Sequence, residues 1–332
     1  MNDGGSGGAA GLPALGGQTL VGASARMHEA VRYASALATS GVSGVLLVGE
    51  AGTGKELLAR GIHYAAAPYD PFLTFDCAAV PEPLRAAELF GTHPSLQADA
   101  PPPRRGLIEL AGAGTLFVVD VTRLPLALQR RLASAVRERQ GIREGGDAPV
   151  RVTCRAIVAT STAPEAALAA GTLDAELYEA LAPARIDLPP LRERPGDVRL
   201  LARHFAGAST RLHEDALAAL EAHPWPGNVR ELAQVVERAA AFVGGSEIRA
   251  EHLIVLHRTA RAGSSNQGSP PAAVIHIPDE GKTLARVEGE AVALTLRLTR
   301  GNQSAAARIL DISRPTLARK LREHGIAPRA DG

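Results

Sequence analysis

The amino-acid sequence predicts an α/β fold, a parallel sheet flanked by helices, followed by a helical domain and a C-terminal all-α helix-turn-helix. Three observations predict this arrangement. Short apolar runs between residues 45 and 188 alternate with helical segments, as in parallel strands joined by crossover helices. After Pro189 and Pro190 the apolar periodicity is only helical. Near the C-terminus, two short helices are separated by Asp311–Ser313, which is the spacing of a helix-turn-helix.

The elements follow from this pattern in order. Residues 1–19 are dominated by glycine and alanine and predict a disordered lead. The α/β part is expected over 20–188, a helical lid over 189–259, a flexible linker over 260–281 and the helix-turn-helix over 282–328. The expected strands are 45–48, 72–75, 116–119, 152–159 and 186–188, and the expected helices are 27–39, 198–205, 214–222, 229–242, 284–298 and 314–324.

The length and composition limit which classes of protein this chain can belong to. With 332 residues, of which 45% are apolar, the chain is long enough for two or three domains and a sizeable core. No apolar run is long enough to cross a membrane and no signal peptide is found, which predicts a cytoplasmic protein without a membrane partner. Cys77 and Cys154 lie far apart in apolar stretches, which favours buried thiols over a disulfide or metal site.

The stretch Val45–Leu58, VLLVGEAGTGKELL, predicts a phosphate-binding P-loop between a buried strand and a helix. Its glycines allow positive φ, so that successive N–H groups and a helix N-terminus face one anion. Lys55 adds a charge for the β- and γ-phosphates, while Glu56 stands where Ser or Thr commonly ligates Mg²⁺. An ordinary glycine-rich turn is the alternative. The predicted binding residues are Gly49, Glu50, Ala51, Gly52, Thr53, Gly54, Lys55, Glu56 and Leu57.

Five motifs together resemble the AAA+ domain of bacterial enhancer-binding proteins, the activators of sigma-54 RNA polymerase. The resemblance covers residues 20–254 and implies an AAA+ P-loop domain that binds ATP or ADP, with a helical lid. In that family a glutamate at the position of Glu56 is usual. The motifs are GEAGTGKELLARGIHYA (49–65), ELFG (88–91), GTLFVVD (114–120), LPPLRERPGDV (188–198) and HPWPGNVRELAQVVERA (223–239), and the later GNQSAAARILDISRPTLARKL (301–321) resembles the family's Fis-type helix-turn-helix.

The end of the predicted strand 116–119 departs from the family. The family's Walker B acidic pair aligns with Val119 and Asp120, so one carboxylate is left. Hydrolysis there needs one carboxylate for Mg²⁺ and a second to polarise the attacking water. A register shift would keep Asp120 for the metal but would put Val121 in place of the catalytic acid. The departure implies that the water lacks its base, and it leaves Mg²⁺ binding open.

Other hydrolysis residues of the family also differ. The sensor I asparagine aligns with Ser161, and the two trans-acting arginines align with Asp174 and Ala180. Asp174 reverses the sign of the charge and would repel a neighbour's γ-phosphate. Arg230 matches the sensor II arginine that approaches the nucleotide, although a structural ion pair is an alternative role for it. The resemblance therefore implies a binding set without catalytic residues, the alternative being an active enzyme with substitutes elsewhere.

The family's contact with the sigma factor is also missing. After ELFG the family carries a GAFTGA loop, whereas this chain has SLQADA at 95–100 followed by Pro101, Pro102 and Pro103. Prolines fix φ and stiffen a segment into an extended form. The resemblance thus implies no sigma-54 contact, while another contact with RNA polymerase stays open.

The C-terminal module is basic, with ten Lys or Arg and four acidic residues over 282–329, which predicts a polyanion partner, double-stranded DNA. A recognition helix places its N-terminal residues at base edges in the major groove. We therefore assign Arg314, Thr316 and Arg319 to bases, and Lys320 and Arg322 to phosphates. A solvated basic face is the alternative. The apolar residues Leu284, Val287, Ala291, Leu294 and Leu298 are candidates for a homodimer contact or for the module's own core.

Three functions fit these observations. The favoured one is a sequence-specific transcriptional regulator whose AAA+ domain binds nucleotide with little or no hydrolysis and acts without sigma-54. The second is an active sigma-54-dependent activator ATPase. The third is an accessory subunit that joins the ring of an active relative and modulates it.

Overall fold

In this computed structural model the chain forms two units, one ending at Arg261 and one beginning at Ala262. The structure describes residues 15–16, 20–93 and 104–253 of the first unit. In the second it describes 284–298 and 302–326, except 304–305, 308–309, 311 and 325. No helix in these ranges is both long and apolar enough to span a bilayer.

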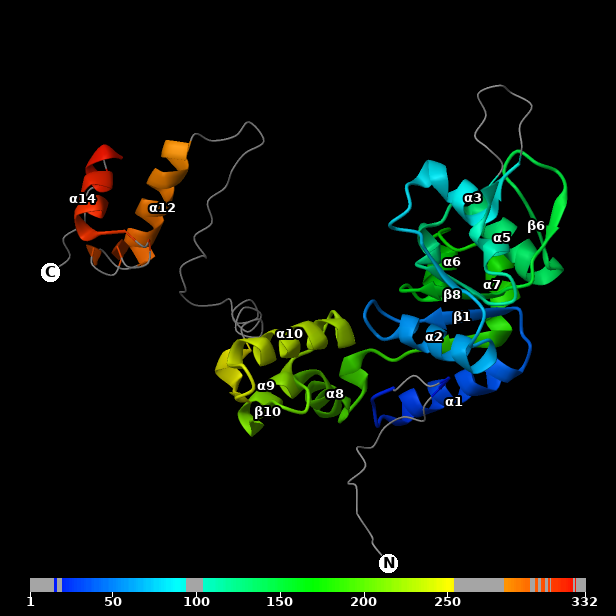
Figure 1. Ribbon diagram of the computed structural model, residues 1–332, viewed down its shortest axis with the longest axis horizontal. Helices are drawn as coiled ribbons and strands as arrows, with labels where there is room; N and C mark the ends of the chain where they lie inside the picture. Colours follow the sequence, from blue (N-terminus) through cyan, green and yellow to red (C-terminus); the bar gives the residue numbers. More distant parts are fainter. Residues whose placement is uncertain are drawn as a thin grey trace, which may run out of the picture. The chain divides into compact units, whose positions relative to one another are not determined.

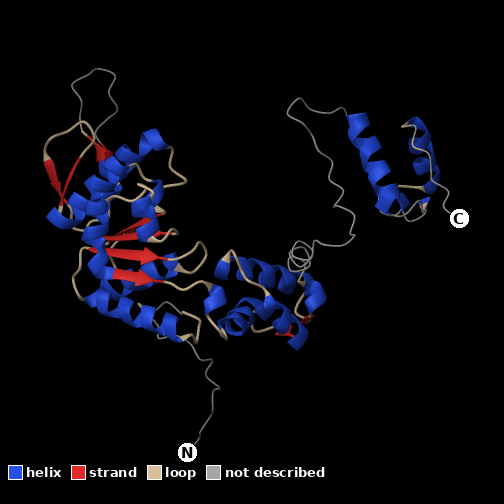
Figure 2. Cartoon of the chain, turned by 180° about the vertical axis from the view of Figure 1, so that it is seen from behind, coloured by secondary structure: helices blue, strands red, loops and turns tan. Residues whose placement is uncertain are grey.

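The first unit is built on a five-stranded parallel sheet in the order β2-β5-β8-β1-β9. Figure 2 draws strands in red. Every residue of β1 is buried, as expected of a central strand with helices on both faces. The predicted α/β class is confirmed, although the fourth strand begins three residues later than expected. The strands are β1 Gly44–Val48, β2 Phe72–Asp76, β5 Thr115–Val119, β8 Arg155–Thr160 and β9 Arg185–Asp187.

Helices cover both faces of this sheet (Figure 1). Val45 and Leu47 point into a core shared with α1 (Ala25–Thr39) and α2 (Lys55–Ala66). Leu46 and the other alternate residues face a second core, because successive side chains of a strand point to opposite faces. The helices on that side are α3 Glu82–Phe90, α4 Leu107–Leu110, α5 Leu126–Glu138, α6 Pro164–Ala169 and α7 Ala175–Leu181.

Both cysteines lie in the second core, as predicted. Burial raises the pKa of Cys77 to about 12 and that of Cys154 to about 11. Since the thiolate is the reactive form, neither thiol is primed for chemistry.

The predicted disordered lead is wrong at Leu15. This residue is 3% exposed and belongs to the core formed with α1 and α2. It fills a slot above Gly61 of α2, where an added Cβ would lie 2.9 Å from Leu15 Cδ2. Leu15 therefore anchors the described part of this glycine- and alanine-rich segment to the domain.

Two antiparallel hairpins extend from the sheet. In the first, β3 (Gly91–Thr92) pairs with β4 (Arg104–Arg105), and the intervening residues 94–103 lie outside the described residues. The predicted SLQADA segment and its prolines fall there. In the second, β6 (Gln140–Ile142) pairs with β7 (Pro149–Arg151). Glu144 joins the two hairpins, because its N–H donates to the Gly91 oxygen at 2.8 Å.

The lid is helical, as predicted, with boundaries within a residue of those expected. Its helices are α8 Asp197–Ala206, α9 Glu214–Ala222 and α10 Asn228–Val243. They pack around Trp225, which is 1% exposed. A short parallel pair, β10 (Arg211–Leu212) with β11 (Glu247–Ile248), was not predicted.

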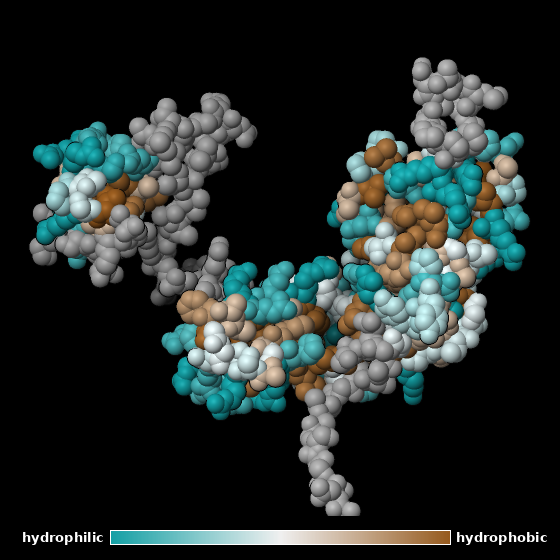
Figure 3. Space-filling model, viewed as in Figure 1, coloured by the Kyte–Doolittle hydropathy of each residue, from teal (hydrophilic) through white to brown (hydrophobic). Residues whose placement is uncertain are grey.

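The second unit contains α12 (Leu284–Leu298) and α14 (Arg314–Glu323) around a small apolar core. Figure 3 shows apolar side chains gathered between these two helices and hydrophilic ones on the outer side of α14. Ser313 caps α14, since its Oγ accepts the Thr316 N–H at 3.2 Å. The predicted linker at 260–281 lies outside the described residues.

Candidate functional site

The P-loop joins β1 to α2 and carries the backbone geometry that anion binding requires. Gly52 has φ +79° and Gly54, the residue before α2, has φ +105°, both in the left-handed region that favours glycine. Gly52 also lies against the lid, because an added Cβ would stand 2.2 Å from the Gly227 oxygen. The Val229 N–H donates to the Gly52 oxygen at 3.0 Å. The conformation of the loop is therefore set both by its own glycines and by its contacts with the lid.

Lys55 is held at the centre of the loop. Its Nζ donates to the oxygens of Gly49 at 2.5 Å and Glu50 at 3.0 Å, and to Ser161 Oγ at 3.2 Å. Ser161 Oγ in turn donates to Asp120 Oδ1 at 2.8 Å. Burial lowers the pKa of Lys55, while the nearby Asp120 opposes this shift. A row of polar groups thus links Lys55 to Asp120 through Ser161.

These groups line a pocket of about 320 Å³ between the loop and the lid. Arg230 lines it from α10, so the structure brings the predicted sensor II residue to the P-loop. Thr53 is an exception among the predicted binding residues, because it is 1% exposed and its Oγ1 donates to the Glu50 oxygen. The pocket is lined by Ala51, Gly52, Gly54, Lys55, Glu56, Leu57, Phe117, Val119, Asp120, Ser161, Phe205, Val229, Arg230 and Ala233.

A larger groove of about 740 Å³ lies between α1 and β9. Two of its arginines are engaged with acids of the same chain: Arg26 pairs with Glu193 at 2.5 Å, and Arg185 pairs with Asp187 at 2.8 Å. It lacks a glycine-rich loop and a buried lysine. We therefore take the smaller pocket as the functional site.

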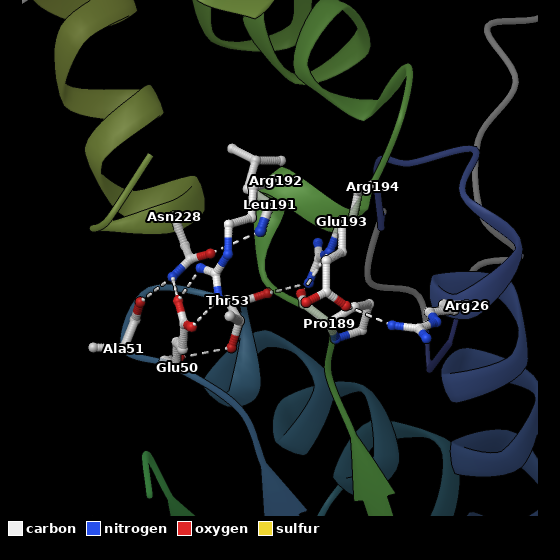
Figure 4. A network of polar contacts seen from close by, with 10 residues as sticks. All are labelled: Arg26, Glu50, Ala51, Thr53, Pro189, Leu191, Arg192, Glu193, Arg194 and Asn228. Carbon is white, nitrogen blue, oxygen red and sulfur yellow. Dashed lines mark hydrogen bonds and ion pairs between the residues drawn. The ribbon is translucent and has the colours of Figure 1, made fainter. Parts of the chain in front are cut away.

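The side chain of Glu50 joins the loop to the lid (Figure 4). Its carboxylate accepts hydrogen bonds from Arg192 at 2.6 and 2.9 Å and from Asn228 Nδ2 at 3.0 Å. Asn228 Nδ2 also donates to the Ala51 oxygen at 3.0 Å. The hydrogen bonds from Arg192 and Asn228 lower the pKa of Glu50 to about 2. The carboxylate is therefore engaged within the chain, and a nucleotide contact by the backbone of Glu50 stays a prediction.

Arg192 and Asn228 were missed as site residues. Both stand in motifs that the sequence analysis quoted, yet their role depends on how the lid meets the loop. Arg194 completes this contact, since its Nη2 donates to the Thr53 oxygen at 2.9 Å and its Nε to the Pro189 oxygen at 2.9 Å. Arg194 is 3% exposed, so it is a buried residue that joins the lid to the P-loop.

The Glu50 pair predicts a dependence of stability on pH. Because the folded-state pKa lies below the ordinary 4.5, the stabilisation is fully present above that value and is lost as pH falls toward 2. Acid titration of unfolding for wild type and Glu50→Gln should give a difference in free energy that shrinks over this window. A difference that stays constant with pH would contradict the assignment.

β5 ends at Val119, as the sequence predicted, and Asp120 follows it. Val119 is the last residue of the strand and pairs in register with Asp76 of β2. Asp120 follows with φ +53°, a left-handed conformation that is uncommon outside glycine. Val119 and Asp120 both line the pocket, but Asp120 alone of the two carries a carboxylate.

The prediction that Asp174 presents a repelling carboxylate to a neighbouring subunit is wrong. Its side chain is 7% exposed and caps α7, accepting the N–H groups of Glu176 at 3.0 Å and Leu177 at 3.3 Å. Arg130 Nε also donates to it at 2.8 Å. The carboxylate faces the N-terminus of α7 within its own domain. There it accepts N–H groups that an uncapped helix would leave unsatisfied. Ala180 lies later in α7 and packs partly buried against the core.

We expect Asp174→Ala to lower the free energy of unfolding by about 1–2 kcal/mol, because it removes a helix cap and leaves Arg130 unpaired. Asp174→Asn, which keeps the cap acceptor, should lose less. Urea denaturation of both variants measures the difference, and equal losses would show that capping is not its role.

On α14 the predicted DNA-contacting residues separate into two groups. Arg314 and Arg322 are exposed, and Arg319 is exposed while pairing with Glu323 at 2.5 Å. Thr316 is half-buried at the first turn. These four remain available to a ligand on the outer side of the helix.

Lys320 corrects the prediction of a phosphate contact. Its Nζ pairs with Glu288 of α12, and its side chain is only 17% exposed. The ammonium of Lys320 lowers the pKa of Glu288. Lys320 therefore ties the two helices of the module together.

The predicted dimer contact is only partly described. The side chains of Leu284, Val287 and Leu298 lie outside the described residues, and Ala291 and Leu294 are half-buried. The described core of the module includes Val292, Leu296 and Ala307, which were not predicted for it, together with Ala306, Leu317 and Leu321.

Three family models match the chain. They are the sigma-54 interaction domain over residues 20–187, the AAA+ ATPase lid domain over 192–270 and the Fis family of bacterial regulatory proteins over 283–324. The crystal structures of NtrX from Brucella abortus with ADP and with ATP resemble this structure with TM-scores of 0.67 and 0.65 and identities of 26% and 28%. Each comparison covers 92% of this chain and 69% of NtrX.

Characterised relatives are similar over most of the chain. The regulatory protein AtoC of Escherichia coli is 38% identical over 86% of this chain and 63% of AtoC. The DNA-binding transcriptional regulator NtrC of Salmonella typhimurium is 35% identical over 92% of this chain and 70% of NtrC. The chain thus spans about two thirds of the length of these relatives. It belongs to the bacterial enhancer-binding proteins, DNA-binding transcriptional regulators that carry a sigma-54 interaction domain of the AAA+ class.

Proposed function

We propose that this chain is a sequence-specific regulator whose AAA+ domain binds ATP or ADP, hydrolyses ATP poorly or not at all, and acts without contacting sigma-54. One observation carries the proposal: the pocket keeps its cations, Lys55 and Arg230, while the end of β5 offers Val119 in place of an acid. Binding and hydrolysis require different groups, and only the first set is complete.

The residues of the P-loop fit a nucleoside diphosphate or triphosphate. Gly52 and Gly54 hold backbone in the left-handed conformation at the start of α2, where N–H groups and the helix dipole favour an anion. Lys55 is buried beside them, and a buried cation interacts with phosphate more strongly than an exposed one. The relatives' complexes with ADP and ATP support the same ligand class here.

Hydrolysis requires a base for the attacking water and a cation for the developing charge. Asp120 is the one carboxylate at the end of β5, and its Oδ1 already accepts the Ser161 hydroxyl. Asp174, at the place where the family has a trans-acting arginine, caps its own helix. Asp120 can therefore hold a metal ion or act as the base, but not both, and Asp174 supplies no cation for the developing charge.

Isothermal calorimetry on the full chain tests the ligand. We expect dissociation constants in the micromolar range for ATP or ADP, about −8 kcal/mol of binding free energy. An absence of binding for both nucleotides would overturn the proposal and leave a DNA-binding scaffold.

The DNA-binding half predicts different effects for two cations of α14. Arg314→Ala should cost about 1–3 kcal/mol on a specific site and relax the preference for it, since an exposed residue at the start of a recognition helix reads base edges. Lys320→Ala should instead lower the thermal stability of the module, because it breaks the pair with Glu288. Electrophoretic mobility shifts on specific and random DNA, together with melting curves, separate the two. Equal losses on both DNAs for Arg314→Ala would refute its role in base recognition.

We also propose a homodimer through the C-terminal module and a higher ring through the AAA+ domain, supported by membership of the family. A dimer would bind a two-fold-symmetric site with half-sites about one helical turn apart, or a multiple of it. Co-purification with an active relative would favour the accessory-subunit alternative.

A further inference from the structure

We propose that the pocket binds its nucleotide without Mg²⁺ and prefers a nucleoside diphosphate to a triphosphate. This inference rests on the proposed function of the same site. It follows from how poorly the residues around the pocket fit a magnesium ion. Such an ion takes oxygen ligands in octahedral geometry and uses one or two carboxylates beside the phosphates.

The residue after Lys55 offers a carboxylate that is already paired. Glu56 Oε1 accepts hydrogen bonds from Arg60 Nε at 3.1 Å and Arg60 Nη2 at 2.8 Å, one turn along α2. A metal ion would compete with this guanidinium for the carboxylate. In other P-loops this position holds a hydroxyl for the metal.

The end of β5 is equally poor in ligands. Val119 offers no oxygen in its side chain, and its register partner Asp76 does not line the pocket. Asp76 Oδ1 instead accepts the Ala78 N–H at 2.8 Å. Within the described residues, no group of three or more His, Cys, Asp or Glu could hold a metal. Besides the Glu56 carboxylate, which pairs with Arg60, the pocket lining offers the Asp120 carboxylate, one oxygen of which accepts the Ser161 hydroxyl.

The preference for a diphosphate follows from the same carboxylate. Asp120 is connected to Lys55 Nζ through one hydroxyl, so a phosphate that reaches Lys55 also comes close to Asp120. With a metal between them, a carboxylate and a γ-phosphate attract the same ion. Without one, they are like charges in a partly buried site and repel each other. The shorter ligand keeps the contacts with the loop and avoids this repulsion.

Calorimetric titration of the full chain with ADP and with ATP, each in excess MgCl₂ and in EDTA, tests the proposal. We expect the dissociation constant for ADP to change by less than about twofold between the two buffers, and ATP to bind at least about tenfold more weakly than ADP in EDTA. Nucleotide binding that is lost in EDTA would overturn the inference while leaving the proposed function intact. Failure of both nucleotides to bind in either buffer would overturn the proposed function itself.

Three variants sharpen the test. Asp120→Asn should bring the ATP and ADP constants together, because it removes the repelling charge. Val119→Asp should introduce a dependence on Mg²⁺, because it supplies the missing acid. Asp76→Asn is the matched control, since this carboxylate neighbours Val119 but lies outside the pocket, and it should leave the ADP to ATP ratio unchanged. An Asp120→Asn protein that keeps the tenfold ratio would refute the electrostatic reason.

Discussion

Lys55→Ala is expected to raise the dissociation constant for ADP at least about a hundredfold, a loss of about 2.7 kcal/mol. Lys55 is 9% exposed, and the described pocket lining contains one other cation, Arg230. A phosphate that loses this ammonium keeps the backbone N–H groups but loses the charge-assisted hydrogen bond, which is the stronger kind. Calorimetry on the purified variant measures the change.

The matched control is Arg60→Ala. Arg60 lies on the same helix, pairs with Glu56 and does not line the pocket. It should bind ADP within a few-fold of wild type. Both variants should fold, since alanine favours helices and Lys55 stands in the first turn of α2. An unchanged constant for Lys55→Ala would mean that the nucleotide binds elsewhere.

Asp197→Ala is expected to lower the free energy of unfolding by about 2–4 kcal/mol. Asp197 is fully buried at the start of α8, and its carboxylate accepts the N–H groups of Ala23 at 2.6 Å and Ser24 at 2.9 Å. The Ser24 hydroxyl donates to its other oxygen at 3.1 Å. The substitution leaves these donors unsatisfied and removes an acid beside the buried guanidinium of Arg194. Urea denaturation measures the loss.

Glu193→Ala provides the control, because Glu193 joins the same two parts of the chain through an exposed pair with Arg26. Exposed ion pairs contribute little, so we expect a loss of at most about 1 kcal/mol. If the two variants lost the same free energy of unfolding, burial of the Asp197 carboxylate would not explain its contribution to stability.

The sequence was sufficient for the features that depend on local pattern. The apolar run before Gly49 and the helix from Lys55 predicted β1, the loop and α2, because strand, glycine turn and helix are contiguous. The lid helices were predicted with similar accuracy, since their amphipathic periodicity is strong. The gathering of Arg230 with Lys55 came from the family resemblance.

Features set by distant contacts could not be predicted in the same way. Asp174 was interpreted from its alignment with an arginine, whereas its position before α7 makes it a helix cap. Lys320 was assigned from its charge alone, but Glu288 of α12 lies within reach of it. Leu15 shows no periodicity with its neighbours, and only the slot at Gly61 explains its burial.

The lid contact had a weak signal in the sequence. Arg192, Arg194 and Asn228 stand in two of the motifs, so they could have been flagged as residues of interest. Their partners are backbone and side-chain groups of the P-loop more than 140 positions away in the chain, for example 142 between Arg192 and Glu50. Pattern alone does not pair such groups.

Steady-state phosphate release tests the separation of binding from hydrolysis most directly. The full chain would be measured with saturating ATP, Mg²⁺ and DNA, beside Lys55→Ala under the same conditions. The account predicts that the two proteins release phosphate at the same background rate, although the wild type binds nucleotide at least about a hundredfold more tightly. Sustained release by the wild type that disappears in Lys55→Ala would contradict it.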